Sequence, residues 1–110
     1  MRIKPELLIH RKENFLMSSG QVIVVEIKLQ KLIGINKPEY PEDYKINWIA
    51  FNKEIPHELV RVDNHHNKFL HFHYDEQEEF IEWKSLEQTW KLFQQKIIQK
   101  FGNFEKTEKI

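Results

Sequence analysis

The hydrophobic period of this chain changes from two to about 3.6 near residue 85, and this change restricts the fold more than any other feature. Before it, polar and apolar residues alternate, as in half-buried β-strands. After it, apolar residues recur at spacings of four, three, four and four, in the stripe Leu86, Trp90, Phe93, Ile97 and Phe101. The chain is therefore expected to contain strands followed by one amphipathic helix.

The strands are expected to pair antiparallel, with one hairpin formed by the first two strands and another at 57–74. Apolar and β-branched residues predict strands at 7–17, 21–33, 44–51, 57–63 and 69–74, and a short further strand at 80–83. A Pro-containing loop at 34–43 separates the first hairpin from the rest. The predicted fold class is α+β, with a single antiparallel β-sheet of about five strands and the C-terminal helix packed on one face.

The predicted helix has signals at both ends. Ser85 and Gln88 form a capping box at its start, and Gly102 stands where a left-handed C-terminal cap belongs. With 110 residues the chain is long enough for one core and too short for two. We therefore expect a single α+β domain at 1–102 and a frayed tail at 103–110.

The composition excludes several functional classes. The chain has no cysteine, which rules out disulfides, thiolate catalysis and cysteine-ligated zinc. Seventeen basic residues balance seventeen acidic ones, so any contact with nucleic acid must be a local patch. With three glycines there is no phosphate-cradling glycine loop, and no cofactor is expected. No apolar run is long enough to span a membrane, and the expected location is the cytoplasm.

Four of the six histidines lie between residues 61 and 74, where alternation gathers polar residues on one strand face. The odd positions are Arg61, Asp63, His71 and His73, and the even positions are Val60, Val62, Leu70, Phe72 and Tyr74. The even face is expected to meet the helix, and the odd face to look toward solvent or a concave groove.

The register of this hairpin follows from parity. Residues opposite each other on one face of an antiparallel pair have numbers with an even sum, so a three-residue loop at 66–68 fits and a four-residue loop at 65–68 does not. That register sets Asp63 across from His71 and Arg61 across from His73. Asn67 then occupies a left-handed backbone position, which Asn tolerates.

Three interpretations fit this arrangement. In the first, Asp63 orients a histidine that acts as a general acid or base, while Arg61 or Lys68 holds a phosphate. In the second, His71 and His73 chelate a divalent metal ion with Asp63 as third ligand. In the third, the histidines form the solvated face of a sheet. The spacing alone leaves all three open.

The same segment resembles the TumE-type family of toxins from toxin–antitoxin systems, which are small bacterial and archaeal proteins. The family pattern is Arg-Tyr-Asp-Asn, a lysine within a short variable stretch, and His-x-His. It is matched by Arg61, Asp63, Asn64, Lys68, His71 and His73, and Trp83–Glu87 stands where the family's helix begins. The chain departs from the family at Asn67, Phe69 and Leu70, where glycines or an acidic residue are frequent, and at Phe72, where a basic residue is frequent.

The resemblance implies a toxin that acts on RNA and is neutralised by a partner antitoxin. The favoured prediction is a ribonuclease, with His71 and His73 as acid/base residues and Asp63 as the orienting group, and use of the RNA 2′-hydroxyl as nucleophile would make it metal-independent. Arg61, Lys68 and Asn64 would contact substrate or phosphate. The alternatives are a non-catalytic protein-interaction module and a His/Asp metal-binding domain. Exposed sheet edges allow a homodimer without requiring one.

Overall fold

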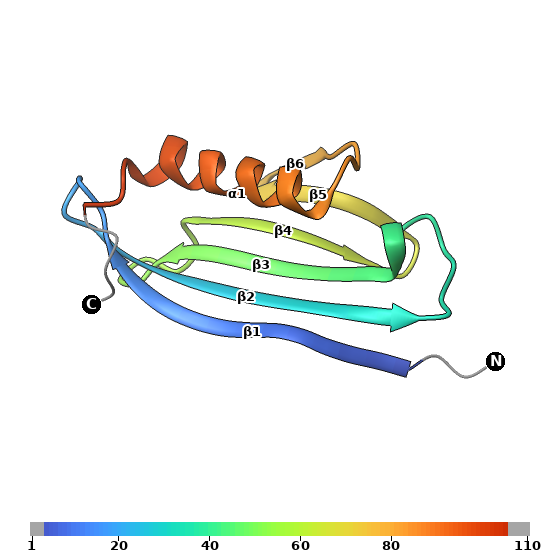
Figure 1. The fold of residues 1–110 in the computed structure, drawn as a ribbon. Coiled ribbons are helices and arrows are strands. Elements are labelled where there is room, and N and C mark those ends of the chain that lie inside the picture. Colours follow the sequence, from blue (N-terminus) through green and yellow to red (C-terminus); the bar gives the residue numbers. More distant parts are fainter. Residues whose placement is uncertain (1–3, 106–110) are drawn as a thin grey trace.

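The computed structural model describes residues 4–105 and contains a six-stranded sheet and a long helix, α1 (Leu86–Phe101) (Figure 1). The strands are β1 (Lys4–Leu16), β2 (Val22–Ile33), β3 (Tyr44–Asn52), β4 (Leu59–His65), β5 (Lys68–Tyr74) and β6 (Gln77–Phe80). A short 3-10 helix, η1 (Pro41–Asp43), precedes β3. The strands pair antiparallel in chain order, β1 to β6. The predicted α+β fold is confirmed.

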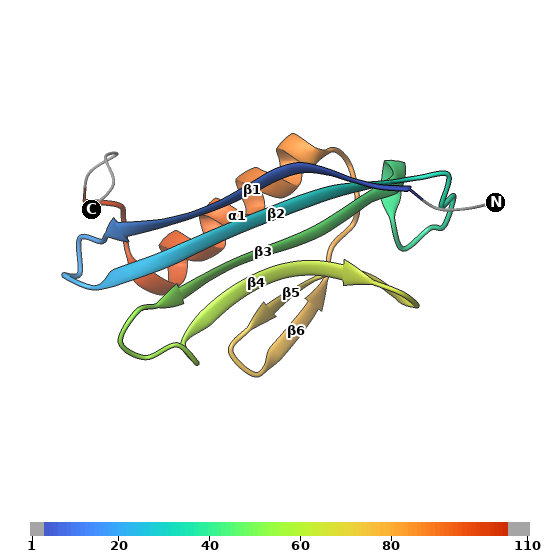
Figure 2. The same ribbon diagram turned by 90° about the horizontal axis from the view of Figure 1, so that it is seen from below.

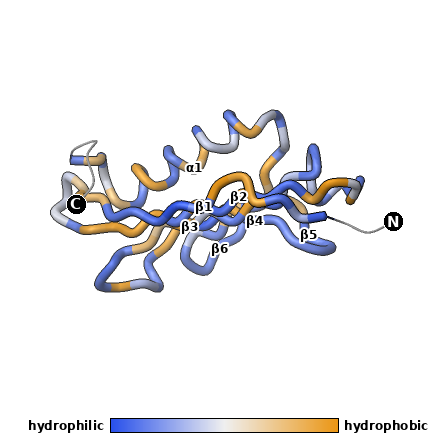
Figure 3. Tube along the Cα trace, turned by 60° about the horizontal axis from the view of Figure 1, so that its bottom comes forward, coloured by the Kyte–Doolittle hydropathy of each residue, from blue (hydrophilic) through white to orange (hydrophobic). Residues whose placement is uncertain are grey.

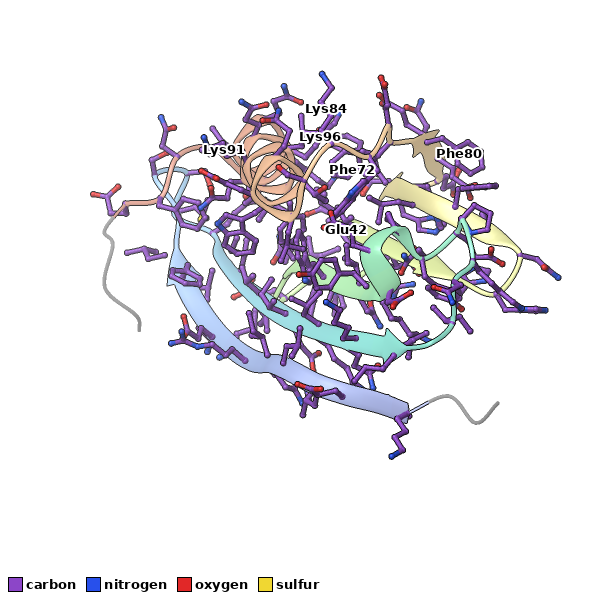
Figure 4. The ribbon with its side chains drawn as sticks, turned by 45° about the vertical axis from the view of Figure 1, so that its right-hand side comes forward. Glu42, Phe72, Phe80, Lys84, Lys91 and Lys96 are labelled. Atoms are coloured by element: carbon purple, nitrogen blue, oxygen red, sulfur yellow. The ribbon has the colours of Figure 1, made fainter. Side chains whose placement is uncertain are left out.

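Helix α1 covers one face of the sheet (Figures 1 and 2). The even-numbered residues of β4 and β5 form part of the core, since Val62 and Phe72 are only 0% and 3% exposed, and Phe93 from α1 is fully buried with them. Figure 4 shows Phe72 and Lys96 between β5 and the helix, and the Lys96 ammonium lies 5.6 Å from the Phe72 ring centre. The odd-numbered residues therefore lie on the opposite face, as predicted.

Both ends of α1 match the sequence signals. The Ser85 hydroxyl accepts a hydrogen bond from the Gln88 N–H at 3.0 Å. Gly102 has a φ of +83°, and its N–H donates to the Ile98 carbonyl at 2.9 Å. A Cβ at Gly102 would lie 3.1 Å from the Ser18 hydroxyl, so glycine also allows this close approach to the first hairpin. Both strands and helix mix hydrophobic and hydrophilic residues along their length, as one-sided burial requires (Figure 3).

The last strand differs from its prediction. A short strand was expected at 80–83, but β6 comprises Gln77–Phe80 and 81–85 is irregular. The reason is a tight turn at Asp75 and Glu76, where Asp75 adopts a φ of +55° and lets β6 pair at once with β5. Two of the acidic residues, Glu78 and Glu79, are therefore strand residues.

The end of the described chain also differs from its prediction. A frayed tail was expected from residue 103, but Phe104 forms a β-bridge with Met17 and its ring packs on Phe15 with centres 5.3 Å apart. The Glu105 N–H donates to the Leu16 carbonyl at 2.9 Å. These contacts fasten 103–105 to the first hairpin. Residues 106–110 of the predicted tail lie outside the described residues.

Candidate functional site

The β4–β5 hairpin has the predicted register but a different turn. Asp63 lies opposite His71 and Arg61 opposite His73, and Asn67 has a φ of +62°, all as predicted. The predicted three-residue loop is wrong, because Lys68 is already in β5 and pairs with His65 across a two-residue turn. A β-bulge between these pairs changes the parity.

The bulge also determines how the His71 side chain of this hairpin is oriented. Between the His65–Lys68 and Asp63–His71 pairs, Phe69 and Leu70 of β5 oppose Asn64 alone. A bulge interrupts the ladder, so a carbonyl within it can accept from a side chain. Nδ1 of His71 lies 2.7 Å from the Phe69 carbonyl oxygen, in the bulge. This contact fixes the orientation of the His71 ring.

Asp63, His71 and His73 form a compact cluster on the sheet face opposite α1. Nε2 of His71 lies 2.8 Å from Nε2 of His73 and 2.9 Å from Oδ1 of Asp63. Nε2 of His73 lies 3.6 Å from the same carboxylate oxygen. The two Nε2 atoms and the carboxylate oxygen therefore converge on one point. The His71 side chain is 0% exposed, against 17% for Asp63 and 31% for His73.

The hydrogen bonds define the histidine tautomers. A carbonyl can only accept, so His71 carries a proton on Nδ1 and, in its neutral form, a lone pair on Nε2. Nε2 of His73 can then donate to that lone pair, which leaves a lone pair on Nδ1 of His73. The buried His71 thus holds the half-exposed His73 in one orientation.

This network leaves one oxygen of the Asp63 carboxylate, Oδ1, without a hydrogen-bond donor. This atom is buried and has no hydrogen-bond partner among the described residues, because the 2.9 Å contact with His71 lacks hydrogen-bond geometry. An unpaired buried carboxylate oxygen facing an imidazole lone pair is unfavourable. A proton or a cation between these atoms would relieve the repulsion.

Neighbouring charges act on His73 in both directions. Its pKa lies below the usual histidine value, mainly because partial burial disfavours the charged form. The carboxylates of Asp63 and Glu78 act against this shift, whereas His71 and Arg61 add to it. Neutral His73 is the form consistent with the tautomers derived above.

Two of the predicted phosphate contacts lie beside the cluster. Arg61 is half-buried opposite His73, and its Nε has no hydrogen-bond partner among the described residues. The Lys68 ammonium forms an ion pair with Glu78 at 2.8 Å. Glu78 itself lies opposite His73, with a carboxylate oxygen 3.9 Å from Nδ1. Sequence reasoning missed Glu78, although an acidic run directly after the hairpin was the available signal.

Asn64 is placed differently from the other predicted contacts. Its side chain is buried, accepts from the Ile46 N–H at 2.8 Å, and donates to the carbonyls of Glu39 and Tyr44 at 2.8 and 3.0 Å. All of these partners belong to the polypeptide backbone. The structure therefore does not bring the Asn64 amide to the exposed side of the cluster, and we leave it out of the site.

His65 and His66 are both exposed, and His71 is buried, so the third interpretation, a solvated histidine face, does not describe the cluster. The ring of Phe80, which Figure 4 shows at the β6 edge, lies 5.9 Å from the His71 ring, measured between ring centres. Burial thus distinguishes His71 and His73 from the exposed His65 and His66, which composition alone cannot do.

Comparisons of the chain with models of protein families, with curated proteins and with solved structures found no match. The resemblance to TumE-type toxins therefore stays a prediction that rests on the quoted motif. Among residues 4–105, no helix is long and apolar enough to cross a membrane.

Proposed function

We propose that this chain is the toxin of a toxin–antitoxin pair and that it cleaves RNA at the Asp63–His71–His73 cluster. The observation that carries the proposal is the anchoring of His73. Its Nε2 atom lies 2.8 Å from a fully buried histidine, so its Nδ1 lone pair stands at the partly exposed end of the network. An oriented imidazole with an accessible lone pair is the group that general base catalysis requires.

In the proposed reaction, Nδ1 of His73 accepts the proton of the RNA 2′-hydroxyl. The 2′-oxygen then bonds to the adjacent phosphorus, the bond to the 5′-oxygen breaks, and the leaving oxygen takes a proton from water. The products are a 2′,3′-cyclic phosphate and a 5′-hydroxyl. The protein supplies proton transfer and charge stabilisation, so this cleavage needs no metal ion.

The neighbouring residues have distinct roles in this proposal. His71 has no exposed surface, so it acts as a positioning residue rather than as the second acid/base residue that the motif implied. The Arg61 guanidinium stabilises the charge that develops on the phosphate. Lys68 supplies a second positive charge if substrate phosphate draws it from Glu78. In this proposal Arg61 and Lys68 are the two cations that contact the RNA phosphates, since the chain as a whole has no net charge.

The cellular setting follows from the substrate. RNA cleavage places the toxin in the cytoplasm, and a neutralising antitoxin would have to cover the β4–β6 face. A homodimer through a sheet edge is compatible with this function. It is not needed for it, because the three cluster residues belong to one chain.

The decisive experiment compares His73→Ala with His65→Ala in RNA cleavage and in growth arrest after induction. Loss of a general base typically lowers the rate by about 100- to 10,000-fold, so His73→Ala should lose cleavage and toxicity together. His65→Ala removes an exposed imidazole from the same hairpin and should behave as wild type. Equal cleavage by wild type and His73→Ala, or no cleavage by wild type, would contradict the proposal.

A further inference from the structure

We infer that Asp63, His71 and His73 also form a binding site for one divalent transition-metal ion such as Zn²⁺, and that this ion and proton transfer by His73 exclude each other. The binding site is argued from geometry alone. The exclusion rests in addition on the proposed function.

The spacing of the three donor atoms fits direct coordination. In a tetrahedral zinc site with metal–ligand distances of about 2.0–2.1 Å, neighbouring ligand atoms lie about 3.3 Å apart. The corresponding distances here are 2.8, 2.9 and 3.6 Å. Shifts of a few tenths of an ångström would therefore place all three atoms around one ion. No other group of three such side chains lies this close among residues 4–105.

The surroundings of His71 favour the tautomer that can bind a metal ion through Nε2. Metal-binding histidines usually donate their second ring N–H to a carbonyl or carboxylate, which aims the other nitrogen at the ion. His71 has this arrangement, with Nδ1 held by the Phe69 carbonyl in the bulge and Nε2 turned toward Asp63 and His73. The backbone thus orients a buried lone pair before any ion arrives.

The carboxylate supplies an independent observation. Oδ1 of Asp63 is buried and has no hydrogen-bond partner among the described residues. Such an oxygen loses hydration without compensation. A cation at the convergence point would contact this oxygen and the Nε2 lone pair of His71, which would remove the repulsion between them, and it would replace the proton on Nε2 of His73.

The donor set selects the class of ion. Two imidazoles and one carboxylate suit zinc and its neighbours, whereas magnesium and calcium prefer sites made of oxygen. Three protein ligands leave a fourth position for water. Because Asp63 and His73 are partly exposed, the ion can enter from the sheet surface.

Coordination would change the tautomer of His73. Proton transfer requires a proton on Nε2 and a lone pair on Nδ1. An ion takes the Nε2 lone pair, so the proton moves to Nδ1 and the accepting atom is lost. The bound ion would therefore silence the proposed base, and removal of the ion would restore it.

The first experiment measures Zn²⁺ binding by the 110-residue chain, purified without a histidine tag and dialysed against chelator, using calorimetry and metal analysis. We expect one ion per chain and a Zn²⁺-dependent rise in melting temperature. His73→Ala and Asp63→Asn should each weaken binding by at least about 100-fold, because each removes a ligand. Circular dichroism checks that both variants are folded.

His10→Ala provides the matched control. His10 forms a surface pair with Glu26 at 3.0 Å, so it offers an imidazole and a carboxylate without a second imidazole. This variant should bind Zn²⁺ as wild type does. Absence of binding by wild type, or equal binding by wild type and His73→Ala, would overturn the site.

The second experiment adds one equivalent of Zn²⁺ to the RNA cleavage assay. We expect inhibition that chelator reverses. Faster cleavage with Zn²⁺ would overturn the exclusion while leaving the site in place. Zn²⁺ binding at the three residues without any RNA cleavage would contradict the proposed function alone, and cleavage without Zn²⁺ binding would contradict the metal site alone.

Discussion

The Asn64 side chain ties three backbone segments together at the end of the candidate site. It bonds to Ile46 and Tyr44 in β3 and to Glu39 in the preceding loop. Without the Asn64 side chain, these backbone N–H and C=O groups would lose a hydrogen-bond partner inside the fold. Asn64 matches a functional motif but serves the structure. Because its hydrogen bonds fix the backbone at this position, they also help to place Asp63, the residue before it, in the site.

Asn64→Ala should lower the free energy of unfolding by roughly 2–4 kcal/mol, because it leaves buried N–H and C=O groups unpaired. Urea denaturation measures the change. Asn47→Ala is the control, since Asn47 is exposed on β3 and its loss should change stability by less than about 0.5 kcal/mol. Similar stabilities for the two variants would show that Asn64 does not hold these segments together.

Sequence reasoning could identify the cluster residues but not their environments. Alternation placed Asp63, His71 and His73 on one face, and parity set Asp63 opposite His71, as the structure has it. Burial of His71 could not be predicted, because it depends on how neighbouring side chains pack around its ring. The orphaned Asp63 oxygen is likewise visible only in three dimensions.

At the scale of elements, the loop before β3 braces the turn of the β4–β5 hairpin. The Glu39 carboxylate accepts from the N–H of Asn67, the left-handed turn residue, at 2.9 Å. Hydrogen bonds from its own backbone N–H and from that of Asn67 lower the pKa of Glu39 below its usual value of 4.5. The turn that positions β5 thus depends on an ionised carboxylate.

The lowered pKa predicts how stability depends on pH. Ionised Glu39 contributes its full stabilisation above the unfolded-state pKa of 4.5 and loses it as pH falls through the lower folded-state value. Wild type should therefore exceed Glu39→Gln in unfolding free energy at pH 7, and the difference should shrink as pH falls below 4.5 and through the lower folded-state pKa. Chemical denaturation across this range measures it. Glu54→Gln, in an exposed loop, is the matched control for the substitution itself and should change stability at pH 7 by less than about 0.5 kcal/mol. A constant difference between wild type and Glu39→Gln across the pH range would contradict the argument.

The periodic elements were predictable and the irregular ones were not. Helix α1 was predicted from a stripe and two caps, because those signals are local. The bulge in β5 and the turn at Asp75 carry no comparable signal: each depends on a single residue leaving the regular ladder. These two irregularities shape the site, because one orients His71 and the other brings Glu78 opposite His73.

At the scale of the whole molecule, the sheet order follows the chain order, so each strand pairs with its predecessor. Such connections are the commonest kind and follow from short loops. The C-terminal segment is the exception, because it returns from α1 to the first hairpin. Ser18 donates its N–H to the Asn103 carbonyl at 2.7 Å, and the Ser18 hydroxyl accepts from the Asn103 N–H at 3.1 Å. This junction joins the C-terminal end of the described chain to the turn between β1 and β2.

The junction predicts a stabilising role for Phe104, in a segment that the sequence suggested would fray. Its partly buried ring packs edge-on against Phe15, with centres 5.3 Å apart. Phe104→Ala should lower the free energy of unfolding by roughly 1–3 kcal/mol, measured by urea denaturation, because it removes this ring contact and apolar burial. Phe69→Ala provides the comparison, since Phe69 is 53% exposed and its loss should cost less. If Phe104→Ala were as stable as wild type, the C-terminal segment would not contribute to closing the fold, and α1 would be held by the sheet alone.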